Sequence, residues 1–130
     1  MCGLHSTASD MLKFLSANIG LIKTKLDDAM QDSHLLRRAS GLPNNIQASD
    51  NNTGQYVGLG WFITTNFGHE VIWTNGASVG GYNAYMAFNP TTERGIVILC
   101  NTYPTDINIF EINFSQDDDL SSLIWGLLNQ

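Results

Sequence analysis

Two hydrophobic periods divide the chain, a helical period near both ends and a strand period in between. Apolar residues recur at helical spacing over residues 11–19 and stop at Gly20, a residue type that commonly ends helices. Ser6 or Thr7 can cap the first turn, because their hydroxyl groups accept hydrogen bonds from free helix amides. The pattern predicts a helix over residues 7–19.

Two further segments have helical spacing, and a polar stretch follows the first of them. Residues 24–39 set leucine, alanine and methionine among acids, with two arginines near the end, and predict a second helix. Residues 41–55 are polar and rich in turn residues, so we expect a surface loop. Three aspartates at 117–119 precede apolar residues at helical spacing, which predicts an amphipathic helix lying on one face of a sheet.

The middle of the chain is typical of strands. Four short runs rich in aromatic and β-branched residues are separated by turn residues, which predicts an antiparallel meander. The runs are residues 58–65, 69–73, 82–89 and 95–100. The last run is apolar without alternation, which predicts a central strand covered on both faces.

The expected fold class is therefore α+β, with an antiparallel sheet of about four strands, N-terminal helices and a C-terminal helix packed on the sheet. We expect one domain over residues 1–130. It would comprise a helical part at 1–40, the loop at 41–55 and the sheet with its helix at 56–130.

Composition excludes several classes of function. With 43% hydrophobic and 14% charged residues, the chain is typical of a globular protein. Its net charge of -6 would repel phosphate backbones, so we expect no nucleic-acid partner. No apolar run approaches the ~18 residues that span a bilayer, and no targeting pattern indicates a location. Cys2 and Cys100 are not expected to form a disulfide.

The candidate chemistry lies on the strand at residues 73–78, Trp-Thr-Asn-Gly-Ala-Ser, and the Gly-Gly-Tyr that follows at 80–82. Five other short motifs accompany it in a fixed order along the chain. They are Gly-Leu-His-Ser-Thr with Asp-Met at 3–11, Gly-Leu-Gly-Trp at 58–61, Tyr-x-Ala-Phe-x-Pro at 85–90, Gly-Ile-Val-Ile-Leu at 95–99 and Tyr-Pro at 103–104. Each is weak alone, but together they carry a specific resemblance.

The six motifs resemble the C-terminal part of the serine β-lactamase and penicillin-binding protein superfamily, and class C β-lactamases with related esterases and D,D-peptidases most of all. The resemblance implies a hydrolase in which a serine is acylated while a lysine and a tyrosine move protons. It also implies a family that often works outside the cytoplasm. No Ser-x-x-Lys occurs here, because Asp10, Gly20 and Ile22 stand three positions before the three lysines. We expect the chain to be inactive by itself.

The resemblance implies roles for individual residues of the strand. The family's Lys-Thr-Gly or His-Thr-Gly motif falls on Thr74, Asn75 and Gly76, where it runs along an edge strand that pairs with substrate. Gly76 suits a close approach of backbone to ligand. Ala77 matches the position whose amide serves as an oxyanion-hole donor. Ser78 completes the set of substrate-strand candidates.

Some positions depart from the family pattern. Thr74 replaces a cation that attracts a substrate carboxylate, and Val79 makes the following turn one residue longer. Thr105 stands where the class C pattern after Tyr-Pro has asparagine, and is a secondary substrate-binding candidate. These changes indicate a neutral or altered substrate, or a site that no longer turns over.

Other candidate sites are less well supported. Ser49-Asp50-Asn51 matches a class A motif by letters, but it lies in the polar segment without a preceding nucleophile. A triad of a histidine (5, 34 or 69) with Ser6 and Asp10 is disfavoured, because Ser6 is better used as a cap. The histidines and cysteines lack metal-ligand spacing, so we expect neither metal nor cofactor. The three tryptophans are expected to pack in the core.

Two functional hypotheses remain. The chain is the C-terminal portion of a serine hydrolase, or it is a non-catalytic binding or assembly module built from the same fold. Under the second hypothesis an unpaired sheet edge would recruit strands from other chains, so we expect a homodimer or pairing with a separately encoded N-terminal half. Pairing with such a half would make a split enzyme, and a small acyl substrate is expected only if the site is completed.

Overall fold

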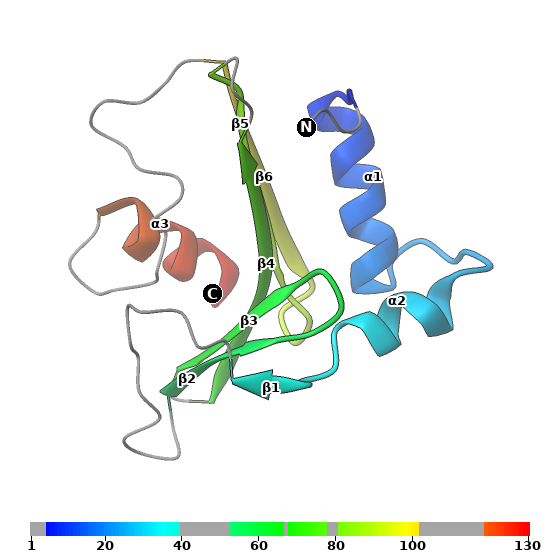
Figure 1. The fold of residues 1–130 in the computed structure, drawn as a ribbon, viewed down its shortest axis with the longest axis vertical. Coiled ribbons are helices and arrows are strands. Elements are labelled where there is room, and N and C mark those ends of the chain that lie inside the picture. The colour runs from blue at the N-terminus through cyan, green and yellow to red at the C-terminus, as the bar shows by residue number, and fades with distance from the viewer. Residues whose placement is uncertain (1–4, 40–52, 67, 78–80, 102–118) are drawn as a thin grey trace.

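The protein is a single antiparallel sheet between two layers of helix. The computed structural model describes residues 5–39, 53–66, 68–77, 81–101 and 119–130. Helices α1 and α2 lie on one side of the sheet and α3 lies on the other (Figure 1). The elements are α1 (Ala8–Ile19), α2 (Asp27–Ser33), β1 (Arg38–Ala39), β2 (Thr53–Val57), β3 (Phe62–Asn66), β4 (His69–Ala77), β5 (Asn83–Asn89), β6 (Arg94–Cys100) and α3 (Asp119–Leu128).

The sheet confirms the expected α+β class and the antiparallel meander. Its strands follow chain order from β1 to β6, and every neighbouring pair is antiparallel. It has six strands in place of the expected four, because β1 and β2 form where the sequence predicted the end of a helix and a loop. These two strands take their conformation from backbone pairing with each other and with β3, which local composition does not reveal.

The position of β6 differs from the position that the sequence predicts. The apolar run was predicted to be a central strand, yet β6 is the last of the strands that the structure describes. It pairs with β5 along its whole length, and no described strand lies on its other side. Apolar residues at every position show that both faces are covered, but they do not say how many strands are neighbours.

The first helix forms as predicted. Thr7 is its N-cap, and the hydroxyl oxygen accepts a hydrogen bond from the Asp10 amide at 3.2 Å. Gly20 ends the helix in the left-handed conformation, with φ of 95°, which glycine adopts without steric cost. The helix is thus bounded by the two residues that the pattern indicated.

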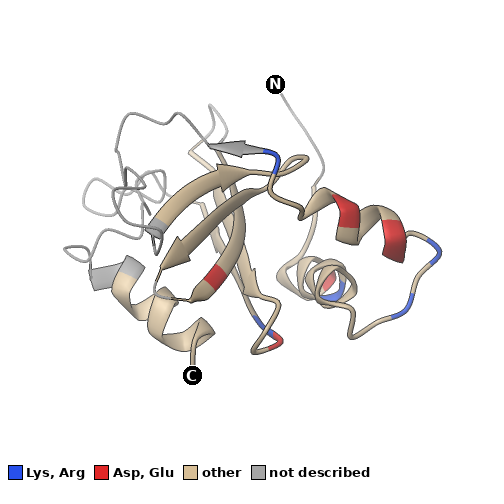
Figure 2. Cartoon of the chain, turned by 90° about the horizontal axis from the view of Figure 1, so that it is seen from below, with Lys and Arg blue, Asp and Glu red and all other residues tan. Residues whose placement is uncertain are grey.

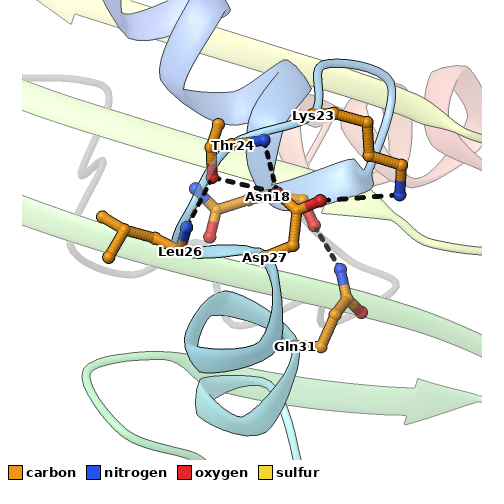
Figure 3. A network of polar contacts seen from close by, with 6 residues as sticks. All are labelled: Asn18, Lys23, Thr24, Leu26, Asp27 and Gln31. Atoms are coloured by element: carbon orange, nitrogen blue, oxygen red, sulfur yellow. Dashed lines mark hydrogen bonds and ion pairs between the residues drawn. The ribbon is translucent and has the colours of Figure 1, made fainter.

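The second helix is much shorter than predicted. The Asp27 carboxylate accepts hydrogen bonds from the Thr24 amide at 2.7 Å and hydroxyl at 2.9 Å, which fixes the turn just before α2 (Figure 3). Gln31 ties α2 to the end of α1 by donating to the Asn18 carbonyl oxygen at 3.1 Å. The helix ends at Ser33, because His34 turns into the core and the chain then enters β1.

Strand alternation sorts the core into two halves. Val71, Trp73, Tyr85 and Ala87 point to the α3 side, where they pack with two residues of that helix. The residues between them in sequence point to the α1 side. That second half contains Leu15, Trp61, Ile63, Ile72 and Phe88.

An aromatic group closes the α1 side near α2. The ring of His34 meets Trp61 and Phe88 edge-on, with centroids 5.4 Å and 5.0 Å away, and Trp61 meets Phe88 at 5.6 Å. We call these three residues the Trp61 cluster. It joins the end of α2, the β2–β3 turn and β5, three segments that are distant in sequence.

Charged residues are unevenly distributed. They gather along α1, α2 and the loop between them, and at the turn that joins β5 and β6, whereas most of the sheet carries none (Figure 2). Ion pairs join Lys13 to Asp10 at 2.9 Å and Arg37 to Asp32 at 2.9 Å. Within the described ranges, no helix is long and apolar enough to cross a membrane.

Candidate functional site

The candidate strand β4 has two halves with different neighbours. Residues 69–73 pair with β3, and the last register pair joins Trp73 to Phe62. Residues 72–77 pair with β5, up to Ala77 opposite Asn83. The part at 74–77 therefore has β5 on one side and no described strand on the other. Its outer backbone edge is open along the motif that the sequence singled out.

Alternation fixes the direction of each side chain on this open part. Trp73 points to the α3 side, where it stacks on Phe62 at 4.7 Å and donates from Nε1 to the Thr64 hydroxyl oxygen at 3.0 Å. Thr74 therefore points to the α1 side and Asn75 to the α3 side. Both are half-buried, whereas Gly76 is exposed. The strand presents a hydroxyl and an amide on opposite faces, with a bare backbone position next to them.

Gly76 stands in open space. A Cβ atom built on it meets no atom of the described residues within 4 Å, so nothing described in this chain requires a glycine there. Gly58 is the opposite case, because a Cβ there would fall on the carbonyl oxygen of Ser33. The absence of a side chain at Gly76 leaves room for a second backbone beside β4, as a pairing substrate requires.

The remaining predicted site residues are less well defined. The backbone of Ala77 is described and pairs with Asn83. Ser78 and Thr105 lie outside the described residues, as does Val79. The structure therefore brings Thr74, Asn75, Gly76 and Ala77 together on one edge. The segments holding Cys2, Ser49-Asp50-Asn51 and Tyr103-Pro104 also lie outside the described residues.

The open part of β4 carries no positive charge. Thr74 supplies a hydroxyl group where a cation would attract a carboxylate, and no described residue of β4 is lysine or arginine. Glu70 lies near the other end of the strand, and partial burial raises the pKa of its carboxyl group. The described residues of β4 therefore supply no cation to pair with an anionic ligand.

The histidines do not form a triad. His34 is buried, its Nε2 lies 3.0 Å from the Asn18 side-chain oxygen, and burial lowers its pKa to about 4. Asp10 interacts with Thr7 and Lys13, and the hydrogen bond from Lys13 is the main reason its pKa is lowered. Among the described residues, no three of the metal-ligating types gather into a possible metal site.

Two buried residues were missed by sequence reasoning. His34 forms part of the Trp61 cluster, and only the fold reveals this, because it brings the His34 ring against Trp61 of the Gly-Leu-Gly-Trp motif. Tyr85 lies opposite Asn75 in the register, is fully buried, and its hydroxyl group has no hydrogen-bond partner among the described residues. Burial raises the pKa of this hydroxyl, so it is a neutral group directly beside the candidate strand. No sequence pattern indicated either role.

Comparison with known families decides the assignment. The Beta-lactamase family model matches residues 2–110, which is most of the chain. The chain belongs to the Beta-lactamase family. No solved structure gives a significant match. The match to the Beta-lactamase family covers the Gly-Leu-Gly-Trp turn and the whole of β4. The structure shows close packing around the turn and an open edge along part of β4.

Proposed function

We propose that residues 74–77 form the substrate-pairing and oxyanion side of a serine-hydrolase site, in the C-terminal portion of a β-lactamase-like enzyme. The observation that carries the proposal is the overhang of β4 past β3, which leaves a free backbone edge beside Gly76. An extended acyl substrate can lie along that edge and hydrogen-bond to it as an added strand. The amide of Ala77 is the candidate donor to the developing oxyanion.

The reaction is acyl transfer on an amide or ester bond. A serine oxygen attacks the carbonyl carbon, the leaving group departs with a proton, and water then releases the acyl group. The 130 residues contain no Ser-x-x-Lys, so the nucleophile and its base must come from another polypeptide segment. The chain alone is expected to turn over neither β-lactams nor esters.

The substrate of this site is expected to be neutral near the strand. A carboxylate beside Thr74 would have no described cation on β4 to balance it. Esters or uncharged amides fit this environment better than anionic β-lactams do.

Turnover assays test the proposal. We expect nitrocefin and p-nitrophenyl butyrate to be hydrolysed in the presence of the purified chain no faster than in buffer alone. Co-expression with a segment that carries Ser-x-x-Lys and Tyr-x-Asn should restore ester turnover. In that complex Gly76→Val should abolish turnover by placing a branched side chain beside the open edge, whereas Leu26→Val, at an exposed leucine between α1 and α2, should not.

Two results would contradict the proposal. One is turnover by the chain alone that a serine-directed acylating reagent abolishes. The other is a reconstituted enzyme that keeps full activity with Gly76→Val.

A non-catalytic assembly module is the second candidate. Exposed leucines on α1, on the segment after α2 and on α3 favour it, because such surface is usually covered by a partner. The partner is a second copy of the chain or a separate N-terminal half. Light scattering distinguishes the two partners, because a chain that stays monomeric at high concentration does not form a homodimer.

A further inference from the structure

Trp73 is held from both neighbouring strands at the residue where the described pairing of β4 with β3 ends. On the β3 side its ring stacks on Phe62, with centroids 4.7 Å apart and an angle of 27° between the ring planes. On the β5 side it stacks on Tyr85, at 6.0 Å and 28°. The three rings form one stack on the α3 side of the sheet, which crosses β3, β4 and β5. We call it the Trp73 stack.

A buried hydrogen bond fixes the orientation of the middle ring. The indole Nε1 of Trp73 donates to the hydroxyl oxygen of Thr64 at 3.0 Å. Thr64 lies opposite Val71 in the register, so the bond runs diagonally between β3 and β4. The Thr64 side chain is only 1% exposed. A buried hydroxyl group needs a hydrogen-bond partner, and an apolar residue of the same shape does not, so packing alone gives no reason for threonine at this position.

The direction of residues 74–77 depends on the geometry at Trp73. Among the described strands, these residues pair with β5 on one side only. Ala77 lies four residues beyond Trp73, which corresponds to about 13 Å along an extended strand. A tilt of β4 by about 10° at Trp73 would therefore move the Ala77 amide by about 2 Å, whereas catalytic groups must be held within about 0.5 Å.

We propose that Trp73 is a positioning residue, which sets the direction of residues 74–77 through the Trp73 stack and its hydrogen bond to Thr64. Its role is indirect, because it acts through the backbone that follows it and not through contact with a substrate. The inference rests on the proposed acyl-transfer role of residues 74–77 and identifies what aims the Ala77 amide. A backbone donor that is held in advance stabilises a developing oxyanion without moving during the reaction.

Hydrogen exchange in the full chain tests this role. The measured quantity is the exchange rate of those amides at 74–77 that pair with β5. Thr64→Val removes the acceptor and should speed their exchange at least about ten-fold by local opening. Thr64→Ser keeps the hydroxyl group and should exchange at the parent rate. Trp61→Phe is the control, because it alters a buried tryptophan on the α1 side, and it should speed exchange at 74–77 less than about two-fold while lowering the free energy of unfolding.

A second variant shows whether Trp73 and Thr64 act through the same bond. Trp73→Phe keeps a ring in the Trp73 stack but removes the N–H donor, so it should also speed exchange at 74–77. Adding Thr64→Val to Trp73→Phe should produce no further acceleration, because the bond is already lost.

Three results would overturn the inference. Equal exchange rates at 74–77 in the parent chain and in Thr64→Val would mean that the bond does not hold the strand. Equal acceleration by Thr64→Val and Trp61→Phe would mean that these amides follow global stability alone. Additive acceleration by Thr64→Val and Trp73→Phe would mean that the two residues act separately. None of these measurements involves turnover, so a failure here is distinct from a failure of the acyl-transfer proposal, which is judged by ester hydrolysis.

Discussion

The open part of β4 and the Trp61 cluster differ in what the rest of the chain demands of them. The cluster is closed: His34, Trp61 and Phe88 meet edge-on, and the turn beside them is pinned by the Leu59 amide, which donates to the Ser33 carbonyl oxygen at 2.8 Å. The part of β4 at 74–77 has a described strand on one side only, and a Cβ built on Gly76 meets no described atom within 4 Å. Both regions carry motifs of the Beta-lactamase family. Folding alone explains the motif in the Trp61 cluster, but it does not explain the motif on β4. This contrast is why we propose that β4 carries the function.

Removal of a ring from the cluster should have the largest effect. Phe88→Ala is expected to lower the free energy of unfolding by about 4 kcal/mol, because it leaves a cavity among buried aromatic rings. The matched control is Phe14→Ala, at a half-exposed ring on α1, which should cost less than about 1 kcal/mol. Urea unfolding followed by tryptophan fluorescence measures both. Equal losses would mean that the cluster does not hold the fold.

The glycine beside the cluster should be nearly as sensitive. Gly58→Ala is expected to cost about 3 kcal/mol, because the new methyl group falls on the Ser33 carbonyl oxygen and α2 must move away. The same urea titration measures the loss. A variant as stable as the parent chain would show that the end of α2 is not packed as described.

Acidification should weaken the cluster through His34. Its pKa is lowered from 6.5 to about 4 by burial, so the unfolded chain takes up the proton first as the pH falls. The contribution of neutral His34 is fully present above pH 6.5 and is lost between about pH 6.5 and 4, on the order of 2 kcal/mol in total. Its contacts within the fold are to the uncharged Asn18, Trp61 and Phe88.

The comparison with His34→Gln isolates this term, because the carboxylates titrate in both proteins. The difference in unfolding free energy between the two should change across pH 6.5 to 4 and be flat above it. A flat difference throughout would mean that His34 is protonated as readily in the fold as outside it.

The smallest effect is expected at the open end of β4. Gly76→Ala should change the free energy of unfolding by less than about 0.5 kcal/mol or raise it slightly, since a strand prefers alanine to glycine and the site is empty. Thermal unfolding by circular dichroism measures the change. A loss comparable to that of Gly58→Ala would mean that Gly76 is packed against the chain itself, and the reason to place function there would disappear.

The sequence predicted the elements whose causes are local. The cap at Thr7, the stop at Gly20 and the strand runs from β3 to β6 follow from side-chain chemistry and hydrophobic period. It missed β1 and β2, because β1 forms by pairing with β2, which is distant in sequence, and β2 forms by pairing with β3. It predicted a central position for β6, which is the last strand in the described part of the sheet, because an apolar run indicates covered faces and not the number of neighbouring strands.

The candidate site stays a prediction, and its surroundings could not be predicted from the sequence. Thr74, Asn75, Gly76 and Ala77 were chosen from a motif, and the structure sets them on one open edge. The buried Tyr85 opposite Asn75 could not be foreseen, since its place depends on the register between β4 and β5. Register depends on how two strands pair, so the sequence of one strand alone does not specify it.

The overhang of β4 also bears on how this protein can change over time. A substitution at Gly76 disturbs little of the described packing that holds the chain folded, so selection for a folded chain does not conserve this position. Chemistry at the edge can be lost, or turned toward a new substrate, while the sheet beneath it persists. Thr74, at the position where the resemblance implies a cation, is the kind of change that such an edge permits.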